Sequence, residues 1–481
     1  MPDKQTPLLC EESVSGRCGA LLPRLDVPQT PVPETLLRDS LKLPELDECT
    51  VVRHFTLLSQ KNFSVDSQFY PLGSCTMKYN PKMNEDAAAQ KGFRQSHPLS
   101  GDSANQGNLE LMYKLQEALK AITGFVSCTL QPAAGAHGEL TGILMIRAWH
   151  LSRRDKTRNR ILVPDSAHGT NPATCTMAGY ITETIPSDAK GAVDLDALKE
   201  AVAGGRAKTV AGMMITNPGT QGLFEIHIAD IIKIIHDAGG LVYGDGANMN
   251  ALMGIVKPAE LGFDVMHLNL HKTFSTPHGG GGPGAGAVIA NKTLAAFLPG
   301  PIAAKNKDAY ELASPEQTIG AVKSFHGNFA VLVRAYAYIR ALGADGLKRA
   351  SQYAVLNANY LRHLCRAKFP TPYGAERPCM HEFTASPNLG NGVHTLDIAK
   401  RLIDYGFHPP TIYFPLTVKE AFMAEPTETE TMETLEAFAG ALEKIAAEAE
   451  AEPELLHDAP HHTPVGRLDE VAAARNLKLR W

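Results

Sequence analysis

The sequence predicts an α/β protein with a large domain built on a mostly parallel sheet, followed by a smaller C-terminal α+β domain. From about residue 108 to 290, short apolar runs alternate with segments of helical spacing. Parallel strands buried on both faces give such continuous apolar runs, and helices connect them. After about residue 325 the pattern changes to long amphipathic helices. We expect the large domain over residues 71–325 and the small domain over residues 326–481.

Residues 1–70 are expected to form an N-terminal arm. Pro23, Pro28, Pro31 and Pro33 interrupt this segment. Because proline lacks the amide hydrogen that helices and sheets require, these residues leave only short helical stretches. Such arms often wrap a neighbouring chain, but composition alone leaves that point open.

Two helices are expected before the first expected strand. The first helix has one apolar face and ends at Gly124. A second helix is expected from Gly135 to about Trp149. The apolar face of the first helix consists of Leu111, Leu115, Leu119 and Ile122.

Five short apolar runs are expected to form strands of the large domain. The helix between the second and third runs has isoleucines at helical spacing, from Ile228 to Ile235, and ends at Gly239 and Gly240. Each run is continuous rather than alternating, so helices should cover both faces of the sheet. The runs are 161–163, Val210–Thr216, 241–243, 265–270 and 285–290.

Two long amphipathic helices are expected in the small domain. Residues 329–342 place Leu332, Tyr336 and Ile339 on one face. The second helix has a longer apolar face, made of Met432, Leu435, Phe438, Leu442 and Ile445. No repeat with a period of about 20–50 residues is present, so a solenoid is excluded.

Composition excludes several functional classes. Hydrophobic residues make up 44% of the 481 residues and charged residues 20%, as in a folded globular chain. The net charge of −5 offers no positive field to nucleic acid or an anionic membrane. No apolar run approaches the roughly 18 residues of a membrane helix, and the N-terminus lacks the features of a secretory signal. We expect no nucleic-acid or membrane partner and a cytoplasmic location.

The eight cysteines form no C-x-x-C pair. Their spacing supports neither a zinc site nor a disulfide framework. We expect reduced thiols and no metal site.

Polar side chains follow four of the expected strands at the point where each strand ends. Because the carboxyl ends of parallel strands meet at one edge of a sheet, where ligands bind, we expect His168, Asp245 and Lys272 to lie at a common rim. This convergence is stronger evidence than any single residue. The four segments are 165–171 (DSAHGTN), 217–220 (NPGT), 244–248 (GDGAN) and 271–273 (HKT).

Lys272 and Asp245 fit the needs of pyridoxal phosphate. A partly buried lysine after an apolar strand is a usable amine nucleophile. A buried aspartate can hold a proton on the pyridine nitrogen, which makes the ring an electron sink, and the imidazole of His168 could stack on a flat ring. Each residue alone has a structural alternative: a snorkelling or salt-bridged lysine, a turn or N-cap aspartate, and a satisfied core histidine.

Two glycine-containing segments are candidates for binding a phosphate group. Gly135 and Ala136 open an expected helix, where small residues let backbone amides approach a phosphate; a plain N-cap is the alternative. Gly279, Gly281 and Gly284 satisfy G-x-G-x-x-G, but no strand precedes them and no helix follows. A dinucleotide site is therefore rejected, and a flexible or closely packed loop beside Lys272 is expected.

Several long motifs resemble the glycine decarboxylase P-protein family. The resemblance covers residues from about 45 to 481, and the length is similar to that of the second subunit of the split bacterial form. The motifs are 70–78 (YPLGSCTMK), 165–173 (DSAHGTNPA), 244–248 (GDGAN), 269–274 (NLHKTF) with the following PHGGGGPG, and 463–470 (TPVGRLDE).

The resemblance implies a fold type I pyridoxal 5'-phosphate enzyme with a sheet of the seven-stranded type. Lys272 matches the lysine that binds the cofactor covalently, Asp245 the partner of the pyridine nitrogen, and His168 the ring-stacking histidine. The remaining positions implied as cofactor-binding are Gly135 and Ala136 in the phosphate loop, together with Ala247 and His271.

The implied reaction is the decarboxylation of glycine with transfer of the aminomethyl group to the lipoyl arm of H-protein. The implied partner chain is subunit 1 of the split P-protein, in a hetero-oligomer with two copies of each chain. Another fold type I activity, such as an aminotransferase or amino-acid decarboxylase, could use the same three residues. A non-catalytic, partner-binding subunit is the third alternative, and the presence of Lys272 argues against it.

Overall fold

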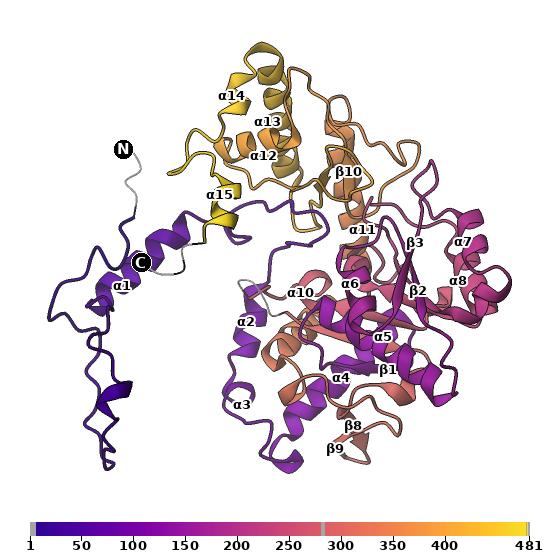
Figure 1. Cartoon of the computed structure of the whole chain (residues 1–481), viewed down its shortest axis with the longest axis horizontal. Helices are drawn as coiled ribbons and strands as arrows, with labels where there is room; N and C mark the ends of the chain where they lie inside the picture. The colour runs from indigo at the N-terminus through magenta and orange to yellow at the C-terminus, as the bar shows by residue number, and fades with distance from the viewer. Residues whose placement is uncertain (1–5, 280–283, 478, 480–481) are drawn as a thin grey trace.

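A seven-stranded sheet lies at the centre of the large part of the molecule (Figure 1). The structure is a computed structural model that describes residues 6–279, 284–477 and 479. The strand order is β1-β7-β6-β5-β4-β2-β3, and β7 alone among these strands runs antiparallel to its neighbours. The strands are β1 (Ser127–Thr129), β2 (Arg160–Pro164), β3 (Ile181–Ile185), β4 (Val210–Thr216), β5 (Leu241–Asp245), β6 (Val265–Asn269) and β7 (Gly286–Ala290).

Helices cover both faces of this sheet because its central strands are apolar on both sides. All seven residues of β4 are buried. Met213 faces a core shared with Leu115 and Ile231, whereas Met214 faces a second core that contains Ile143. The covering helices are α4 (Gln106–Thr123), α5 (Gly135–Ser152), α6 (Thr170–Met177), α7 (Leu195–Ala201) and α8 (Ile228–Asp237).

The C-terminal part has its own core around a small antiparallel sheet of order β10-β12-β11. Helix α11 leads from the large part into it and is interrupted at Gly343, whose φ of 62° is left-handed. This break explains why helical periodicity was evident only as far as residue 342. The elements are α11 (Phe329–Cys365), β10 (Phe383–Ala385), α12 (Thr395–Asp404), β11 (Thr411–Ile412), β12 (Phe422–Ala424) and α13 (Met432–Ala451).

The remaining elements, apart from helix α1 (Glu48–Gln60), are short. They are α2 (Lys82–Ala88), α3 (Lys91–Arg94), α9 (Pro258–Leu261), α10 (Leu270–Thr273), the antiparallel pair β8 (Ile302–Asn306) and β9 (Ala309–Ala313), α14 (Glu454–His457), α15 (Glu470–Arg475) and the 3-10 helices η1 (Glu34–Leu36), η2 (Asp102–Ala104), η3 (Gly204–Thr209), η4 (Gly246–Ala251), η5 (Ala295–Phe297) and η6 (Ser324–His326).

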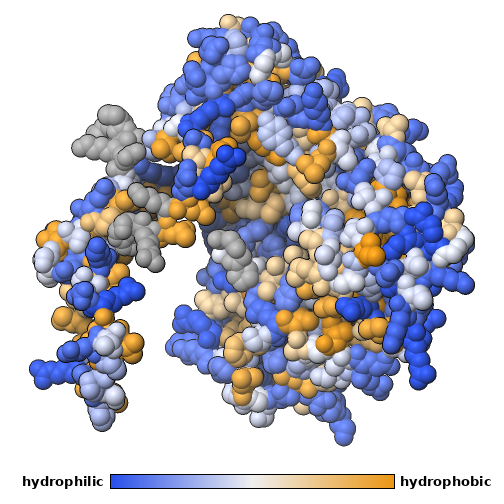
Figure 2. Space-filling view, in the orientation of Figure 1, coloured by the Kyte–Doolittle hydropathy of each residue, from blue (hydrophilic) through white to orange (hydrophobic). Residues whose placement is uncertain are grey.

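The N-terminal arm extends away from the rest of the molecule (Figure 1). Before helix α1 (Glu48–Gln60) its one regular element within the described residues is η1. Apolar side chains on the arm face solvent, including Leu21 at 94% and Leu22 at 89% exposure (Figure 2). The single chain thus leaves a long apolar segment uncovered.

Residues 70–78, which we name the strap, return from the arm and pass between the two sheets. Leu72 forms a bridge with Ala424, the last residue of β12, and the hydroxyl of Thr411 donates to the carbonyl of Gly73. A side chain at position 73 would overlap Met423, at 2.2 Å from its Cγ, so this close contact requires glycine. The strap joins the C-terminal part to the large sheet.

The structure confirms the predicted α/β fold class and the five predicted strands. Strand β1 was not predicted because it has only 3 residues, and β3 was not predicted because it alternates threonine and glutamate at an exposed edge. The predicted domain limits at residues 70 and 325 stay a prediction. Residues 280–283 of the glycine-rich run lie outside the described residues. No helix in the described part of the chain is both long and apolar enough to cross a membrane.

Candidate active site

Lys272 lies in α10, immediately beyond the carboxyl end of β6. The preceding Leu270 and following Thr273 are fully buried, so the backbone of this turn is fixed by the core, and Lys272 itself is 8% exposed. Its Nζ donates a hydrogen bond of 2.8 Å to the backbone carbonyl of Ser74 in the strap. The amine is therefore held at the sheet edge rather than in open solvent.

Asp245 ends β5 and is buried, with 2% exposure. Its carboxylate accepts hydrogen bonds from the backbone amide of Ala247 (3.0 Å) and from Nδ2 of Asn171 (3.1 Å). His267 Nε2 lies 3.6 Å from Oδ1. Burial alone would raise the pKa of Asp245, but the His267 imidazole and the two hydrogen bonds outweigh it and lower the pKa. The buried carboxylate is thus ionised and can hold a proton on a ring nitrogen.

His168 belongs to a hydrogen-bonded chain that leads to Asp245. Its Nδ1 lies 2.8 Å from the hydroxyl of Thr170, and that hydroxyl donates to Glu139. Glu139 also accepts from Nδ2 of Asn171, which donates to Asp245 as well. The imidazole meets Phe414 edge to face, with ring centroids 5.8 Å apart. This chain fixes the ring orientation of His168 near the carboxylate.

Gly135 and Ala136 begin α5, whose N-terminus has no side-chain cap. A Cβ at position 135 would lie 2.8 Å from Oδ1 of Asn269 and 3.1 Å from Nε2 of His267, so glycine is required for this close approach. Uncapped amides at the start of a long helix are suited to an anion such as phosphate. His267 is shared with Asp245, so the helix start and the aspartate lie side by side.

His271 lies beside the same edge but is already engaged. Its Nδ1 is 3.2 Å from the carbonyl of Ala285, and its ring meets that of His278 edge to face. Burial, with added repulsion from His278 and Lys272, lowers the pKa of His271 to about 3. The imidazole is neutral at neutral pH and offers a hydrogen bond rather than a charge.

The structure therefore brings the predicted residues to one edge of the sheet. Asp245, His168 and Gly135 are linked through shared neighbours, and Lys272 follows three residues after Asn269, which contacts Gly135. A buried lysine, an ionised buried aspartate and a free helix start are the groups that pyridoxal phosphate needs. The hydroxyl of Thr216 and Oδ1 of Asn269 are buried there without a partner within the described residues. The residues present fit this cofactor, and their individual roles stay a prediction.

The sequence did not predict a set of buried side chains that the C-terminal part contributes to this site. The backbone amide of Ser74 donates to Glu382 (2.6 Å), and the hydroxyl of Thr76 donates to Glu425 (2.5 Å). Both glutamates are completely buried, as is His381. The available signal in the sequence was two titratable residues, His381 and Glu382, just before an apolar segment, and Glu425 just after another.

The same cluster bears on metal binding. One ligand atom each from His381, Glu382 and Glu425 lie within 4.8 Å of one another, the one such group found among the described residues. Burial lowers the pKa of His381 to about 3, so its imidazole is neutral. No sequence motif indicates a metal here, and the absence of a metal site stays a prediction.

Cys75 lies beside the cluster, with its Sγ 3.4 Å from Nε2 of His278. Burial raises the pKa of its thiol, and Lys272 only partly offsets that effect. A thiol with a raised pKa is a poor nucleophile at neutral pH.

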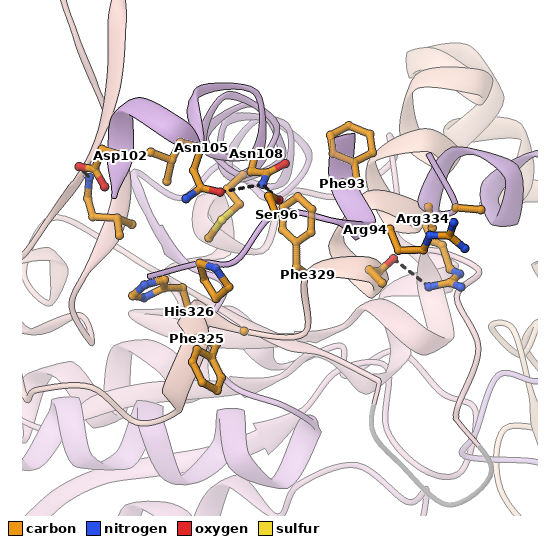
Figure 3. Close-up of a pocket in the computed structure, with 18 of the residues that line it drawn as sticks. Phe93, Arg94, Ser96, Asp102, Asn105, Asn108, Phe325, His326, Phe329 and Arg334 are labelled. Atoms are coloured by element: carbon orange, nitrogen blue, oxygen red, sulfur yellow. Dashed lines mark hydrogen bonds between the residues drawn. The ribbon is translucent and has the colours of Figure 1, made fainter. Parts of the chain in front are cut away.

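A cavity of about 630 Å³ lies elsewhere, between α2, α3, α4 and the start of α11 (Figure 3). Its wall includes Phe93, Phe329 and Met112, and Arg334 pairs with Glu85 at its edge. It contains none of the residues predicted from the sequence. We therefore place the candidate site at the sheet edge, on the chemistry of the side chains rather than on cavity size.

Comparisons with known proteins agree with this arrangement. A family model described as "Glycine cleavage system P-protein" matches residues 26–371, and one described as "Glycine dehydrogenase, C-terminal domain" matches residues 350–461. The chain is 55% identical, over 98% of both chains, to the "Probable glycine dehydrogenase (decarboxylating) subunit 2" of Caldanaerobacter subterraneus subsp. tengcongensis.

Solved structures share the fold. A crystal structure of glycine decarboxylase (P-protein) of the glycine cleavage system, in inhibitor-bound form, has a TM-score of 0.72 and 20% identity over 86% of this chain and 93% of that chain. A cysteine desulfurase from Thermococcus onnurineus NA1 has a TM-score of 0.59 and 16% identity over 79% of this chain and 95% of that chain. At such identities the likeness concerns the fold alone.

Proposed function

The chain belongs to the glycine cleavage system P-protein family, and from this premise we propose that it decarboxylates glycine as subunit 2 of a split enzyme and transfers the aminomethyl group to the lipoyl arm of H-protein. The observation that carries the proposal is the 55% identity over 98% of both chains to a relative named for this activity. The site supports it, because Lys272, Asp245 and His168 meet at one edge of the sheet.

Pyridoxal 5'-phosphate, when bound, supplies a conjugated ring that can take up the electrons left behind by the loss of CO₂. Lys272 would hold this cofactor covalently until glycine takes its place. Asp245 would keep a proton on the ring nitrogen, because its ionised carboxylate is fixed by Ala247 and Asn171. His168 would stack on the ring, and Thr170 and Glu139 hold its imidazole in place.

The phosphate group would bind at the start of α5. The backbone amides of Gly135 and Ala136 are uncapped there and carry the partial positive charge of a helix start. Ala247 and His271 border the same edge. His271 is neutral, so we assign it a hydrogen-bonding role.

The partner chain is subunit 1 of the split enzyme, in a complex with two copies of each chain. The relative's name, "subunit 2", implies a second subunit. The exposed apolar arm offers a surface for that subunit, and lipoylated H-protein accepts the aminomethyl group. The cytoplasmic location expected from the sequence stays a prediction.

Two rival functions are not favoured. An aminotransferase or another amino-acid decarboxylase would use the same three residues, but the relatives at high identity carry a different name. A purely partner-binding subunit has no need of a lysine buried at the sheet edge.

Borohydride trapping tests the proposal. The purified chain, supplied with pyridoxal 5'-phosphate, should turn yellow, and borohydride should fix the cofactor on the peptide that contains Lys272. Labelling at another lysine would refute the site assignment. Exchange of bicarbonate carbon into glycine that depends on lipoylated H-protein separates the proposed reaction from transamination, which depends on a keto acid.

A further inference from the structure

Two buried carboxyl groups lie behind the strap and have no part in the function proposed above. Glu382 directly precedes β10, and Glu425 directly follows β12. Both are completely buried, and an oxygen of each lies within 4.8 Å of the other. Two carboxylates this close in a buried site cannot both be ionised without strong repulsion.

The strap connects this pair to Lys272. The carbonyl of Ser74 accepts from Nζ of Lys272 (2.8 Å), while the amide of the same residue donates to Glu382 (2.6 Å). Two residues on, the hydroxyl of Thr76 donates to Glu425. Ser74 has a φ of 65°, a left-handed conformation that is unfavourable for serine and that these contacts maintain.

The other basic side chains near Lys272 are either uncharged or already part of an ion pair. Burial lowers the pKa of His271 to about 3, that of His278 to about 4 and that of His381 to about 3. Lys78 forms a buried ion pair with Glu428. Among the charged groups described around the strap, the Glu382–Glu425 pair is left to balance an ammonium on Lys272.

The pKa values of Glu382 and Glu425 determine how much negative charge the pair carries near Lys272. Burial raises the pKa of Glu382 to about 7 and that of Glu425 well above its usual range, and Lys272 only partly offsets the rise. Near neutral pH Glu425 therefore stays protonated, while Glu382 is partly ionised, so the pair carries at most one negative charge. That charge is of the sign needed to balance an ammonium.

We propose that the Ser74 carbonyl and the Glu382–Glu425 pair form a resting site for the amine of Lys272 while that amine is released from the cofactor. This inference rests on the proposed function, in which glycine displaces Lys272 and the lysine later returns. The resting site stabilises the amine as an ammonium, in which form it cannot compete with glycine. Glu382 and Glu425 are thus positioning residues that act on the lysine, not on the substrate.

Competitive labelling of the cofactor-free full-length chain tests the resting site. Acetic anhydride reacts only with neutral amines, so the labelling of Lys272, relative to exposed Lys233, reports the neutral fraction when peptides are quantified by mass spectrometry. We expect Lys272 of Glu382→Gln to react about tenfold faster at neutral pH, because lost charge stabilisation frees the amine. Glu382→Asp keeps the charge and should react as the parent does.

Glu430→Gln is the matched control. Glu430 lies between β12 and α13, as Glu425 does. Burial raises the pKa of Glu430 to about 7, but no interaction with Lys272 contributes to that shift. Its labelling profile should equal that of the parent. Should Glu382→Gln fail to fold, Glu425→Gln tests the same pair with the same expectation.

Unchanged Lys272 labelling in folded Glu382→Gln or Glu425→Gln would overturn the resting site. That failure is distinct from failure of the proposed function, since borohydride trapping at Lys272 is measured separately in the cofactor-loaded chain. A faster reaction in Glu430→Gln equal to that in Glu382→Gln would also overturn it, because the effect would then be general loosening.

Discussion

Asp245 is ionised although it is buried, because four neighbours favour its charged form. Asp245→Asn keeps the size of the side chain and can still accept the hydrogen bond from Ala247. The variant should therefore fold and hold cofactor but fail to keep the ring nitrogen protonated. Glycine–bicarbonate exchange should fall by orders of magnitude, because delocalisation of the negative charge lowers much of the barrier. Near-normal exchange with full cofactor content would mean that Asp245 is structural.

Gly135 is required by a contact rather than by an unusual backbone angle. Gly135→Ala would place a Cβ 2.8 Å from Oδ1 and 2.9 Å from Nδ2 of Asn269. The start of α5 must shift, so cofactor affinity should fall at least about tenfold, a cost of about 1.4 kcal/mol. Titration with pyridoxal 5'-phosphate, followed by absorbance, measures this loss. Gly107→Ala is the control, since it lies near the start of another 18-residue helix with no atom within 4 Å of the added carbon.

Glu382 should make stability depend on pH in a defined direction. Burial raises its pKa from 4.5 to about 7 in the folded chain. Its contribution to stability is thus fully present below pH 4.5, where the unfolded chain is also protonated, and is lost as pH rises through about 7. Glutamine cannot ionise, so Glu382→Gln should lose less stability than the parent between about pH 5 and pH 8. Urea unfolding at several pH values measures this, and parallel curves would contradict it.

At the level of elements, the strap is anchored by a buried ion pair. Nζ of Lys78 donates to Glu428 (2.7 Å), Asn250 (2.9 Å) and Tyr338 (3.1 Å), which belong to the segment before α13, to η4 and to α11. The attraction of Glu428 outweighs the effect of burial and raises the pKa of Lys78. One side chain thus joins three separate parts of the chain.

Lys78→Met should destabilise the protein strongly. It leaves Glu428 buried without its charged partner, which typically costs about 3–5 kcal/mol. Lys82→Met is the control, because Lys82 pairs with Asp66 at the surface, where such pairs contribute about 0–1 kcal/mol. Urea unfolding of both variants measures the difference. Equal losses would show that the buried pair does not anchor the strap.

The sequence predicted those elements whose burial produces a recognisable pattern of consecutive apolar residues. The run Val210–Thr216 is apolar throughout, because β4 lies in the middle of the sheet and is covered on both faces. Strand β3 lies at the sheet edge with Ile181 exposed, so its residues carry no such pattern. Helix α12 was missed as well, although its apolar face is clear in the structure at Ile398 and Leu402.

The sequence likewise predicted only part of the candidate site. Asp245 and Lys272 were predictable because the carboxyl ends of parallel strands meet at one edge. Glu382 and Glu425 flank two strands of another sheet, more than a hundred residues further along the chain from Lys272. Their position depends on how two separately formed cores dock through the strap, and no local pattern encodes that docking.

At the scale of the whole molecule, the arm is the part that a single chain leaves unsupported. Between residues 6 and 47 it buries almost nothing, while Leu21, Leu22 and Leu36 face solvent (Figure 2). Contiguous exposed apolar surface of this kind marks an interaction site. The large domain is not repeated within the 481 residues, and the name of the relative, "subunit 2", implies a partner subunit 1.

We therefore expect the chain to be catalytically incomplete alone and to bind subunit 1 through its arm. Replacing Leu21 and Leu22 together by serine should reduce co-purification with subunit 1 by at least about tenfold, because each leucine buried at an interface contributes about 1.5–3 kcal/mol. Leu416→Ser is the control, since Leu416 is 89% exposed but lies outside the arm. Native mass measurement should give two copies of each chain. Full glycine–bicarbonate exchange by this chain with lipoylated H-protein, without subunit 1, would contradict the prediction and show a self-sufficient enzyme.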